Sequence, residues 1–328
     1  MSKRIIAMIL AVFIVGTGLV MSVLTTIVST FLNEEVGYQE ATSTVIQKGD
    51  SSNQIAKIKV KGEITSTDSG GILGTGGAYN HTAALKQLEA IKQDNTIKGV
   101  LLVINSPGGG TYESDEFYQK LKEIKANGKK IYVHMETIAA SGGYYIAMPA
   151  DKIYAGPQSL TGSIGVISQS MDYSELLKNL GIKTNTIKSG AHKDIMSSQR
   201  AMTNEERGIL QSINKDSFNQ FVEVVKEGRK MSEKKVRKLA DGRIYSAQQA
   251  KSNGLIDEIG YQEAALKSLK KELKITHPQL ISFNEGEKGF NNLFGLKSTL
   301  EGLKADFQQI QNILNNKSET RPMYLYEG

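Results

Sequence analysis

Hydrophobic and polar residues alternate along the chain with two different periods, which predict strands and helices in turn. Residues 55–64 alternate apolar and polar side chains with period two, as in a strand with one buried face. Residues 99–105 form a continuous apolar run, which is typical of a parallel strand covered on both faces. Residues 81–94, between these strands, have the apolar spacing of a helix. This strand, helix, strand order predicts a first parallel pair.

The alternation continues beyond this first unit. Further strands are predicted over 130–136, 152–155 and 163–168, and further helices over 112–126 and from 141 to 148. Two capping-box sequences, TNEE at 203–206 and SAQQ at 246–249, each open a helical pattern in the C-terminal half. We therefore expect an α/β fold in which helices cover a mostly parallel sheet.

The N-terminal segment has a different pattern, because residues 5–32 carry no charged side chain. As a helix this segment could span about 40 Å, more than the roughly 30 Å hydrocarbon core of a bilayer. A cleaved signal peptide usually has a shorter apolar run that ends in small residues, and that alternative fits less well. Lys3 and Arg4 precede the segment, so the positive-inside rule predicts a cytoplasmic stretch at 1–4 and an extracellular remainder. We expect a single-pass anchor in the lipid of the cell membrane.

The pattern also suggests how the rest of the chain is divided. Residues 33–54 are rich in polar and small side chains and are predicted to form a tether. The periodic region, 55–275, is long enough for one main globular domain. Residues 276–328 remain as a C-terminal extension and tail, which ends in the apolar and aromatic sequence RPMYLYEG. A disordered tail is usually polar, so this end either packs on the domain or contacts a binding groove.

Composition removes several classes of function. The 328 residues include no cysteine, which excludes thiolate catalysis, disulfides and cysteine-ligated zinc. The formal charge of +6 is mild for this length, and lysines alternate with acidic residues at 86–94 and 120–130. This arrangement suits solvated helix faces, so we expect no nucleic-acid partner. We also expect no cofactor and no resident metal.

A glycine-rich turn, NSPGGG at 105–110, follows the apolar strand predicted at 99–105. Three consecutive glycines let backbone amides approach a ligand closely, and such a turn can direct N–H groups at a developing oxyanion. A phosphate loop is disfavoured because no Gly-Lys-Ser/Thr sequence follows. On this motif alone, a tight turn without any ligand is an equal alternative.

A second glycine-rich sequence, AASGG at 139–143, follows the strand predicted at 130–136. It places Ser141 at a strand-to-helix turn, where a hydroxyl is exposed at the positive end of a helix dipole. Gly142 and Gly143 leave space for an acyl group and supply further N–H donors. The alternative is an ordinary helix-capping serine, which the pentapeptide by itself favours.

A serine nucleophile requires a base, and the residues alone leave its identity open. Among the four histidines, His134 lies in a predicted strand and is expected to pack. His192 and Asp194 could complete a Ser-His-Asp set with Ser141, although residues two apart seldom orient an imidazole on a carboxylate. A lysine is the other candidate, and it must be neutral to accept a proton. Composition does not choose one lysine among so many.

Several motifs occur together in one order, and in this combination the chain resembles the signal peptide peptidase A family in its short Gram-positive form. The resemblance covers nearly the whole chain. The motifs that carry it are VINSPGGG (103–110), AASGGYYIA (139–147), LTGSIGVI (160–167), IKSGAHKDIMS (187–197) and ADGRIYSAQQAKSNGLID (240–257). The fold that this resemblance implies is similar to that of the crotonase and Clp protease superfamily.

The resemblance implies a Ser-Lys dyad. The family's nucleophile falls on Ser141 and its lysine, the general base, falls on Lys193. The family's second hydroxyl, which holds the lysine amine in place, falls on Ser163, and its oxyanion donor falls on Gly108. The N–H of Gly142 is a second oxyanion donor that geometry suggests.

The resemblance further implies a membrane-anchored serine endopeptidase. Such an enzyme degrades released signal peptides, and other short or misfolded peptides, at the outer face of the membrane. A ring-like homo-oligomer of eight protomers is also implied, in which sites are completed across protomer boundaries. We hypothesise that the tail at 321–328 lies in the peptide groove and is trimmed by the enzyme itself. The alternatives are a crotonase-like acyl-CoA enzyme, which the predicted extracellular position disfavours, and a non-catalytic membrane scaffold.

Overall fold

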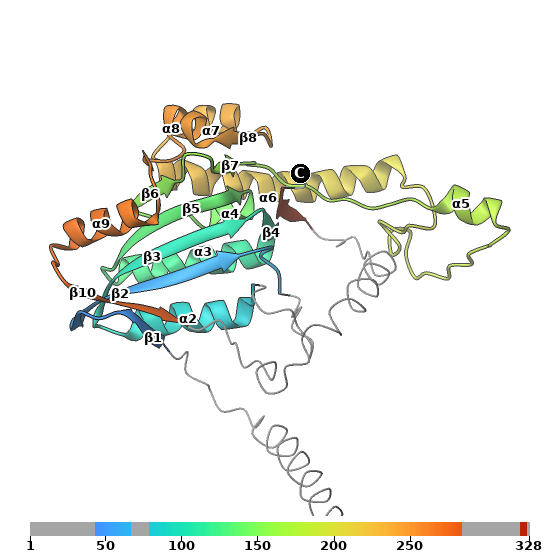
Figure 1. Ribbon diagram of the computed structural model, residues 1–328. Helices are drawn as coiled ribbons and strands as arrows, with labels where there is room; N and C mark the ends of the chain where they lie inside the picture. The colour runs from blue at the N-terminus through green and yellow to red at the C-terminus, as the bar shows by residue number, and fades with distance from the viewer. Residues whose placement is uncertain (1–42, 67–78, 284–321, 327–328) are drawn as a thin grey trace, which may run out of the picture. The chain divides into compact units, whose positions relative to one another are not determined.

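A computed structural model of the chain describes residues 43–66, 79–283 and 322–326 (Figure 1). Strands alternate with helices, and the central sheet is mostly parallel, which confirms the predicted α/β class and is consistent with a Clp protease-like fold. Among the described residues, no helix combines the length and the apolar character needed to cross a membrane. The anchor predicted at 5–32 lies outside these residues.

Within the described residues, nine strands form the main sheet, with the principal order β1, β10, β2, β3, β5, β6, β9. Neighbours along this order are parallel except β1 and β10. At one end of β5 the sheet continues through β7, which is parallel to β5, and β8, which is antiparallel to β7. The bounds are β1 Ser43–Gln47, β2 Asp50–Lys61, β3 Ile97–Ser106, β5 Lys130–Ala140, β6 Lys152–Ala155, β7 Leu160–Gly162, β8 Ile244–Ser246, β9 Glu258–Ile259 and β10 Pro278–Phe283.

Helices cover both faces of the sheet. The larger core cluster packs α2, α3, α4 and the C-terminal half of α6 against one face, while α9 packs its apolar side on the other. Figure 1 shows α5 and the N-terminal end of α6 away from the sheet. The bounds are α2 His81–Gln93, α3 Thr111–Ala126, α4 Gly142–Tyr145, α5 Ser174–Asn179, α6 Asn204–Arg229, α7 Glu233–Leu239, α8 Ala247–Asn253 and α9 Gln262–Leu273.

The central strand β3 is buried on both faces of the sheet, which explains its unbroken apolar run. Val100 and Ile104 belong to the larger cluster, whereas Leu101 and Val103 belong to the cluster under α9. Because successive side chains of a strand point to opposite faces, only a continuous apolar sequence fills both. Each such side chain contributes roughly 1.5–3 kcal/mol through its burial. The sheet thus holds the carboxyl ends of β3 and β5 in fixed positions.

The structure differs from the sequence prediction at three segments. Ser43–Gln47, within the stretch expected to be a tether, forms β1, and Pro278–Phe283, within the C-terminal extension, forms β10 between β1 and β2. Every residue of β1 is exposed, so backbone pairing forms this strand without a hydrophobic pattern to reveal it. The strand predicted at 163–168 is wrong: β7 ends at Gly162, where a positive φ turns the chain out of the sheet.

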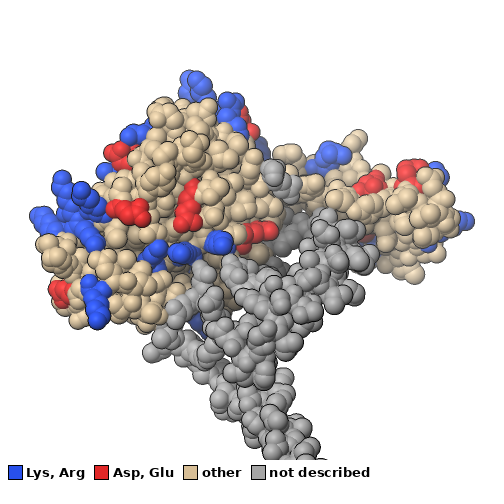
Figure 2. All heavy atoms as spheres, viewed as in Figure 1, with Lys and Arg blue, Asp and Glu red and all other residues tan. Residues whose placement is uncertain are grey.

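The surface carries charges of both signs close to one another. Figure 2 shows Lys and Arg side chains interspersed with Asp and Glu on the viewed face. Within α2, Lys92 lies 2.7 Å from Glu89, and between α2 and α3, Lys92 lies 3.0 Å from Glu123 and Lys120 lies 3.2 Å from Glu89. Exposed pairs of this kind contribute little individually, at about 0–1 kcal/mol each. They satisfy the polar sides of helices whose apolar sides form the core.

Candidate active site

Ser141 lies at the predicted strand-to-helix turn, directly between β5 and α4. Its φ is 53° and its ψ is −118°, a strained conformation for a residue with a side chain. The Ser141 amide donates to the Gly162 carbonyl at 2.8 Å, and the Ser141 carbonyl accepts from Tyr144 and Tyr145 at 2.9 Å. These bonds hold the turn on both sides, so the strain is supported by the packed sheet end.

The geometry also distinguishes Ser141 from an ordinary helix cap. A capping serine has extended dihedrals and accepts a hydrogen bond from the first turn of the helix. Ser141 has a positive φ, and among the described residues its side chain makes no capping hydrogen bond. The helix behind it is shorter than predicted, since α4 ends at Tyr145 after a single turn. The helix dipole is therefore a weak influence here, and the strained turn is the stronger feature.

Ser163 lies beside Ser141 because β7 pairs with β5. Ala140, the last residue of β5, is opposite Gly162, the last residue of β7, and each serine directly follows one of them. Because neighbouring strands lie roughly 4.8 Å apart, the two serines follow directly paired residues at the same end of the sheet. Ser163 also has a positive φ, 49°, and its amide donates to the Arg243 carbonyl at 2.8 Å. The structure thus brings these two predicted site residues together.

The two predicted oxyanion donors also meet at this edge. A Cβ placed on Gly108 would lie 2.7 Å from the Gly142 nitrogen, and one placed on Gly142 would lie 3.2 Å from the Gly108 Cα. Only glycine permits this approach, and Gly108 has a φ of 113° that disfavours side chains. The Gly108 amide donates to the Ser106 hydroxyl at 3.1 Å. A ligand oxygen at Gly108 would therefore share or replace that bond.

A segment from the far C-terminus lies against the same glycines. Residues Met323–Leu325 form β11, which pairs antiparallel with β4, Gly108–Gly110. On the other side of β11, the amides of Met323 and Ile167 each donate to the other's carbonyl, at 2.9 and 3.1 Å. The tail is therefore held as an extended strand between two segments of the domain. A Cβ on Gly108 would lie 1.9 Å from the Tyr324 carbonyl oxygen, which places that carbonyl at the glycine turn.

The Tyr324 side chain fills a slot in the larger core. Its ring lies 4.7 Å from the Phe221 ring and 5.0 Å from the Tyr145 ring, and its hydroxyl donates to the Ser217 carbonyl at 2.8 Å. Tyr145 in turn donates to Asp115 at 2.7 Å. Burial raises the pKa of the Tyr324 and Tyr145 phenols well above their usual range. The slot thus accepts an aromatic ring and a neutral hydroxyl at its end.

Lys193 is not at this edge of the sheet. It lies in a turn region after α5 that leads into α6, and its side chain is exposed. The loop is attached to the N-terminal end of α6 through Glu206, while α6 reaches the Ser141 region through Phe221. The fifteen residues from Glu206 to Phe221 span about 22 Å of helix. The protomer therefore brings Ser141, Ser163 and the glycines together and leaves Lys193 at the other end of α6.

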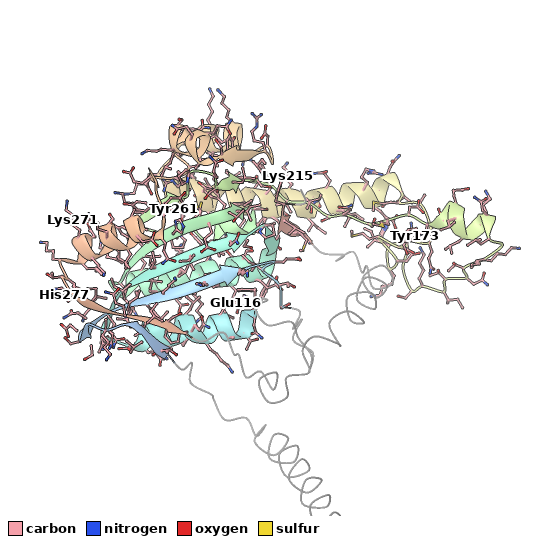
Figure 3. All side chains as sticks on the ribbon, in the orientation of Figure 1. Glu116, Tyr173, Lys215, Tyr261, Lys271 and His277 are labelled. Carbon is pink, nitrogen blue, oxygen red and sulfur yellow. The ribbon has the colours of Figure 1, made fainter. Side chains whose placement is uncertain are left out.

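Two labelled side chains mark this separation in Figure 3. Tyr173 lies beside α5, and Lys215 lies on α6 nearer to the sheet. The Tyr173 amide donates to the Ser198 carbonyl at 2.7 Å, which ties the Lys193 loop to the α5 side. None of the residues of α5 is buried. Lys193 thus belongs to a region that has little contact with the core.

The alternative Ser-His-Asp set does not form. The His192 ring nitrogens lie 3.5 Å from Glu205 and 3.9 Å from Glu206, while both carboxylate oxygens of Asp194 bind cationic side chains. His192 also shares the distant loop with Lys193, so it cannot act on Ser141 of its own chain. His134 is buried in β5, as the sequence predicted.

Sequence reasoning missed three features of this region. The tail was expected in the peptide groove, but its pairing as β11 with Gly108–Gly110 was not predicted, nor were Ser106 as a partner of Gly108 and Arg200 as the centre of the Lys193 loop. Ser106 lies inside the quoted motif NSPGGG, so its position was a usable signal. A single arginine in a polar loop carries no such signal.

Comparison with known proteins supplies independent information about this arrangement. Residues 123–276 match the model of peptidase family S49. A protein of Enterococcus faecium, provisionally named signal peptide peptidase SppA, is 42% identical over 298 residues, which are 89% of this chain and 86% of the relative. A provisionally named protease of Methanocaldococcus jannaschii is 43% identical over 210 residues, which are 64% of this chain and 66% of the relative. Protease 4 of Haemophilus influenzae is 29% identical over 292 residues, which are 84% of this chain and 46% of that longer protein.

Proposed function

The chain belongs to the signal peptide peptidase A family of S49 serine peptidases, and from this membership we propose that Ser141 and Lys193 form its catalytic dyad. The observation that carries the proposal is the strained, uncapped Ser141 beside the glycine turn. A nucleophile at such a turn presents its hydroxyl to a bound carbonyl, as in other strand-to-helix nucleophile elbows. The substrate class that the family suggests is released signal peptides, together with other short or misfolded peptides.

Each proposed site residue has a role in this mechanism. Neutral Lys193 accepts the proton of the Ser141 hydroxyl as its oxygen bonds to the scissile carbonyl carbon. The amides of Gly108 and Gly142 stabilise the oxyanion, and Ser163 holds the Lys193 amine. When the intermediate collapses, the C–N bond breaks and lysinium protonates the leaving amine. Water then hydrolyses the acyl-enzyme, with Lys193 again as the base.

The base is supplied by a neighbouring copy of the chain. Support comes from the position of Lys193 at the far end of α6, where its own Ser141 is out of reach. The same region exposes apolar side chains that a second copy would cover, namely Leu176 at 56%, Leu180 at 65% and Ile182 at 52%. A homo-oligomer, with eight protomers as the family suggests, would therefore bring each Lys193 to a neighbour's Ser141.

Mixing two inactive variants tests the dyad and its assembly together. Ser141→Ala and Lys193→Ala proteins should each hydrolyse a peptide at least about 1,000-fold more slowly than wild type. If the base comes from a neighbour, co-assembly of equal amounts should restore about a quarter of wild-type activity, since one site in four then has both residues. His192→Ala should retain activity. An active Lys193→Ala protein would falsify the dyad, and a mixture as inactive as its parents would place both residues in one protomer.

The C-terminal tail is the first peptide that the groove would meet. The antiparallel pairing of β11 with β4 is the way an extended substrate adds to a sheet edge, and the Tyr324 carbonyl lies at Gly108. We therefore expect the enzyme to trim its own tail. Intact-mass spectrometry should show a shorter C-terminus for the wild type than for Ser141→Ala. Equal masses would remove self-processing without affecting the dyad.

The anchor and the extracellular position of the catalytic domain, residues 55–275 by the sequence division, complete the proposal. The apolar run at 5–32 and the basic residues before it support them. Because the chain has no cysteine, a single Tyr261→Cys substitution at a 64% exposed side chain supplies a unique label site. A membrane-impermeant maleimide should label this cysteine in intact cells. Labelling only after lysis would place the domain in the cytoplasm.

A further inference from the structure

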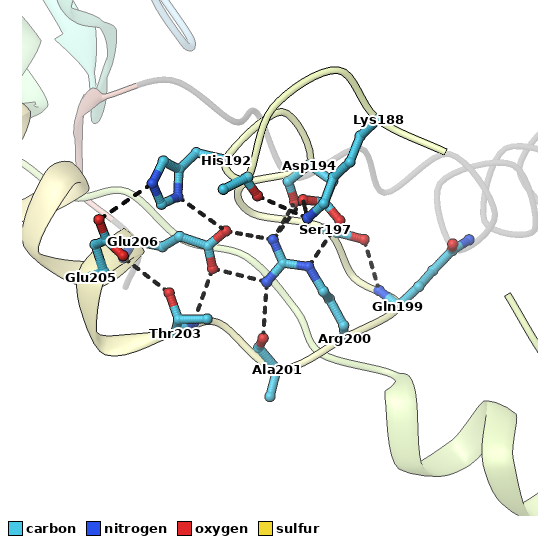
Figure 4. Close-up of polar contacts among 11 residues, drawn as sticks. Lys188, His192, Asp194, Ser197, Gln199, Arg200, Ala201, Thr203, Glu205 and Glu206 are labelled. Carbon is cyan, nitrogen blue, oxygen red and sulfur yellow. Dashed lines mark hydrogen bonds and ion pairs between the residues drawn. The ribbon is translucent and has the colours of Figure 1, made fainter. Parts of the chain in front are cut away.

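The loop that carries Lys193 is organised around one arginine. Arg200 binds both carboxylate oxygens of Asp194, through Nε at 2.9 Å and Nη2 at 2.7 Å (Figure 4). The same guanidinium also donates to both carboxylate oxygens of Glu206, with Nη1 at 2.8 Å from Oε2. Arg200 therefore bridges the residue that follows Lys193 and the first turn of α6. The planar fork of an arginine can satisfy two carboxylates at once, whereas a lysine ammonium cannot do so with the same geometry.

Glu206 is the fixed end of this bridge. Its side chain is only 2% exposed and closes the capping box of α6, accepting from the Thr203 amide at 2.9 Å. The Glu206 amide donates in return to the Thr203 hydroxyl at 3.2 Å. Hydrogen bonds from Arg200 and Thr203 lower the pKa of the Glu206 carboxyl to about 2. A buried group that is charged at neutral pH is a firm anchor for Arg200 at a helix terminus.

Asp194 is the other end of the bridge, and its position matters because it adjoins Lys193. One of its oxygens also accepts from Lys188 at 2.6 Å, and hydrogen bonds from Arg200 and Lys188 lower the pKa of the Asp194 carboxyl. Both oxygens are thus engaged by cations other than Lys193. A carboxylate free to approach Lys193 would stabilise the ammonium form, which cannot act as a base. The charged and titratable groups that form ion pairs in the Lys193 loop are Lys188, His192, Asp194 and Arg200, together with Glu205 and Glu206 on α6.

We propose that Arg200 is a positioning residue for Lys193, which fixes the lysine loop on α6 and keeps the Asp194 carboxylate away from the lysine amine. This role rests on the proposed function, since it presumes that Lys193 is the base. It assigns two effects to one side chain. The paired hydrogen bonds of Arg200 to Asp194 and Glu206 have a geometric effect, and the ion pair with Asp194 has an electrostatic effect. The two effects are separable by substitution.

Arg200→Gln tests both effects. It removes a positive charge and frees Oδ2 of Asp194, while Oδ1 still accepts from Lys188, and both changes favour a protonated lysine. The acid limb of the kcat/KM profile should therefore move to higher pH, by about 0.5–1 pH unit for a partly exposed site. The loss of the fork should also lower kcat at least about 10-fold at the pH optimum. A residue that only supported the fold would lower activity without moving the limb.

Two further variants separate the effects. Arg200→Lys keeps the charge and loses the fork, so kcat should fall while the acid limb stays within about 0.3 pH unit of wild type. Asp194→Asn/Arg200→Gln removes both charges, so the limb should return toward wild type while kcat stays low. The control is Arg237→Gln, which breaks an exposed pair with Glu233 at 2.7 Å on α7 and should change neither quantity.

The possible outcomes distinguish this inference from the proposal beneath it. Activity in Lys193→Ala would remove the base itself. If Lys193→Ala is inactive and Arg200→Gln matches wild type in kcat and in its acid limb, the positioning role is wrong and the dyad stands. Light scattering should give all variants the molar mass of wild type. Loss of assembly in both Arg200→Gln and Arg200→Lys would assign Arg200 to the interface and overturn the positioning role.

Discussion

The region around Ser141 and the region around Lys193 are built in different ways, although the proposed reaction requires both. Ser141 is buried at the carboxyl ends of packed strands, and backbone geometry sets its surroundings. Lys193 is exposed on a loop whose shape depends on ion pairs centred on Arg200. A packed core tolerates almost no displacement, whereas an ionic loop responds to charge, salt and pH. In the proposed enzyme, therefore, the nucleophile is pre-set and the base is the adjustable part.

Among substitutions that keep both Ser141 and Lys193, the largest effect should come from adding one methyl group to the rigid region. In Gly108→Ala the new Cβ would lie 1.9 Å from the Tyr324 carbonyl oxygen and 2.7 Å from the Gly142 nitrogen, and the backbone φ is 113°. Peptide hydrolysis should fall by about 100-fold or more, because the methyl group would push apart Gly108 and Gly142, whose amides we propose as the oxyanion donors. Steady-state kinetics on the purified protein would measure this loss.

Gly128→Ala is the matched control for that substitution. Gly128 also has a positive φ, 83°, but a Cβ there would meet no atom within 4 Å. It should lose roughly 1–2 kcal/mol of stability from backbone strain alone and keep its activity. If both variants lost activity equally, strain rather than occupation of the site would explain the first result.

A smaller effect is expected where the tail meets the rigid region. Tyr324→Ala empties the slot between Tyr145 and Phe221, so β11 should bind less firmly to β4. With the tail strand no longer competing for the groove, kcat/KM for a short peptide should rise by about 3–10-fold. Tyr326→Ala is the control, since the structure ties Tyr326 through its amide to the Pro107 carbonyl at 2.9 Å. Unchanged kinetics in Tyr324→Ala would show that the tail does not obstruct the groove.

Low pH should weaken the Lys193 loop before it weakens the sheet. The pKa of Glu206 is lowered from 4.5 to about 2, so its stabilising contribution is present above about pH 4.5 and is lost as the pH falls toward 2. Amides at 194–206 should therefore lose hydrogen-exchange protection over this range, after correction for intrinsic rates, before those of β3 do. Glu206→Gln should already show weak protection at 194–206 at neutral pH. Equal protection of both regions at pH 3 would contradict this view of the loop.

The sequence predicts these two regions unequally, for physical reasons. Hydrophobic periodicity locates β3, and the glycine motifs locate the turns around Gly108 and Ser141, because burial and close backbone approach constrain residue types. It misses β1, whose exposed residues pair through the backbone, and β10, a short buried strand that the sequence division placed in the C-terminal extension. It also gives no information on where the Lys193 loop lies, since many polar sequences fold as exposed loops. Only the family resemblance selects Lys193, and only the structure shows that its loop is attached to the end of α6 opposite the Ser141 region.

The smallest expected effect compares the two capping boxes that the sequence predicts and the structure confirms. Thr203 caps α6 at the Lys193 end, and Ser246 caps α8 beside β7. Alanine at either position should reduce the free energy of unfolding by about 1 kcal/mol, because one hydrogen bond to the helix terminus is lost. Only Thr203→Ala also removes a partner of Glu206, so it should lower kcat about 2–3-fold while Ser246→Ala leaves kcat unchanged. Thermal denaturation would show that the two losses of stability match, and kinetics would then isolate the contribution of the loop. Equal kcat values in two equally destabilised variants would mean that the Lys193 loop does not depend on its anchor at α6.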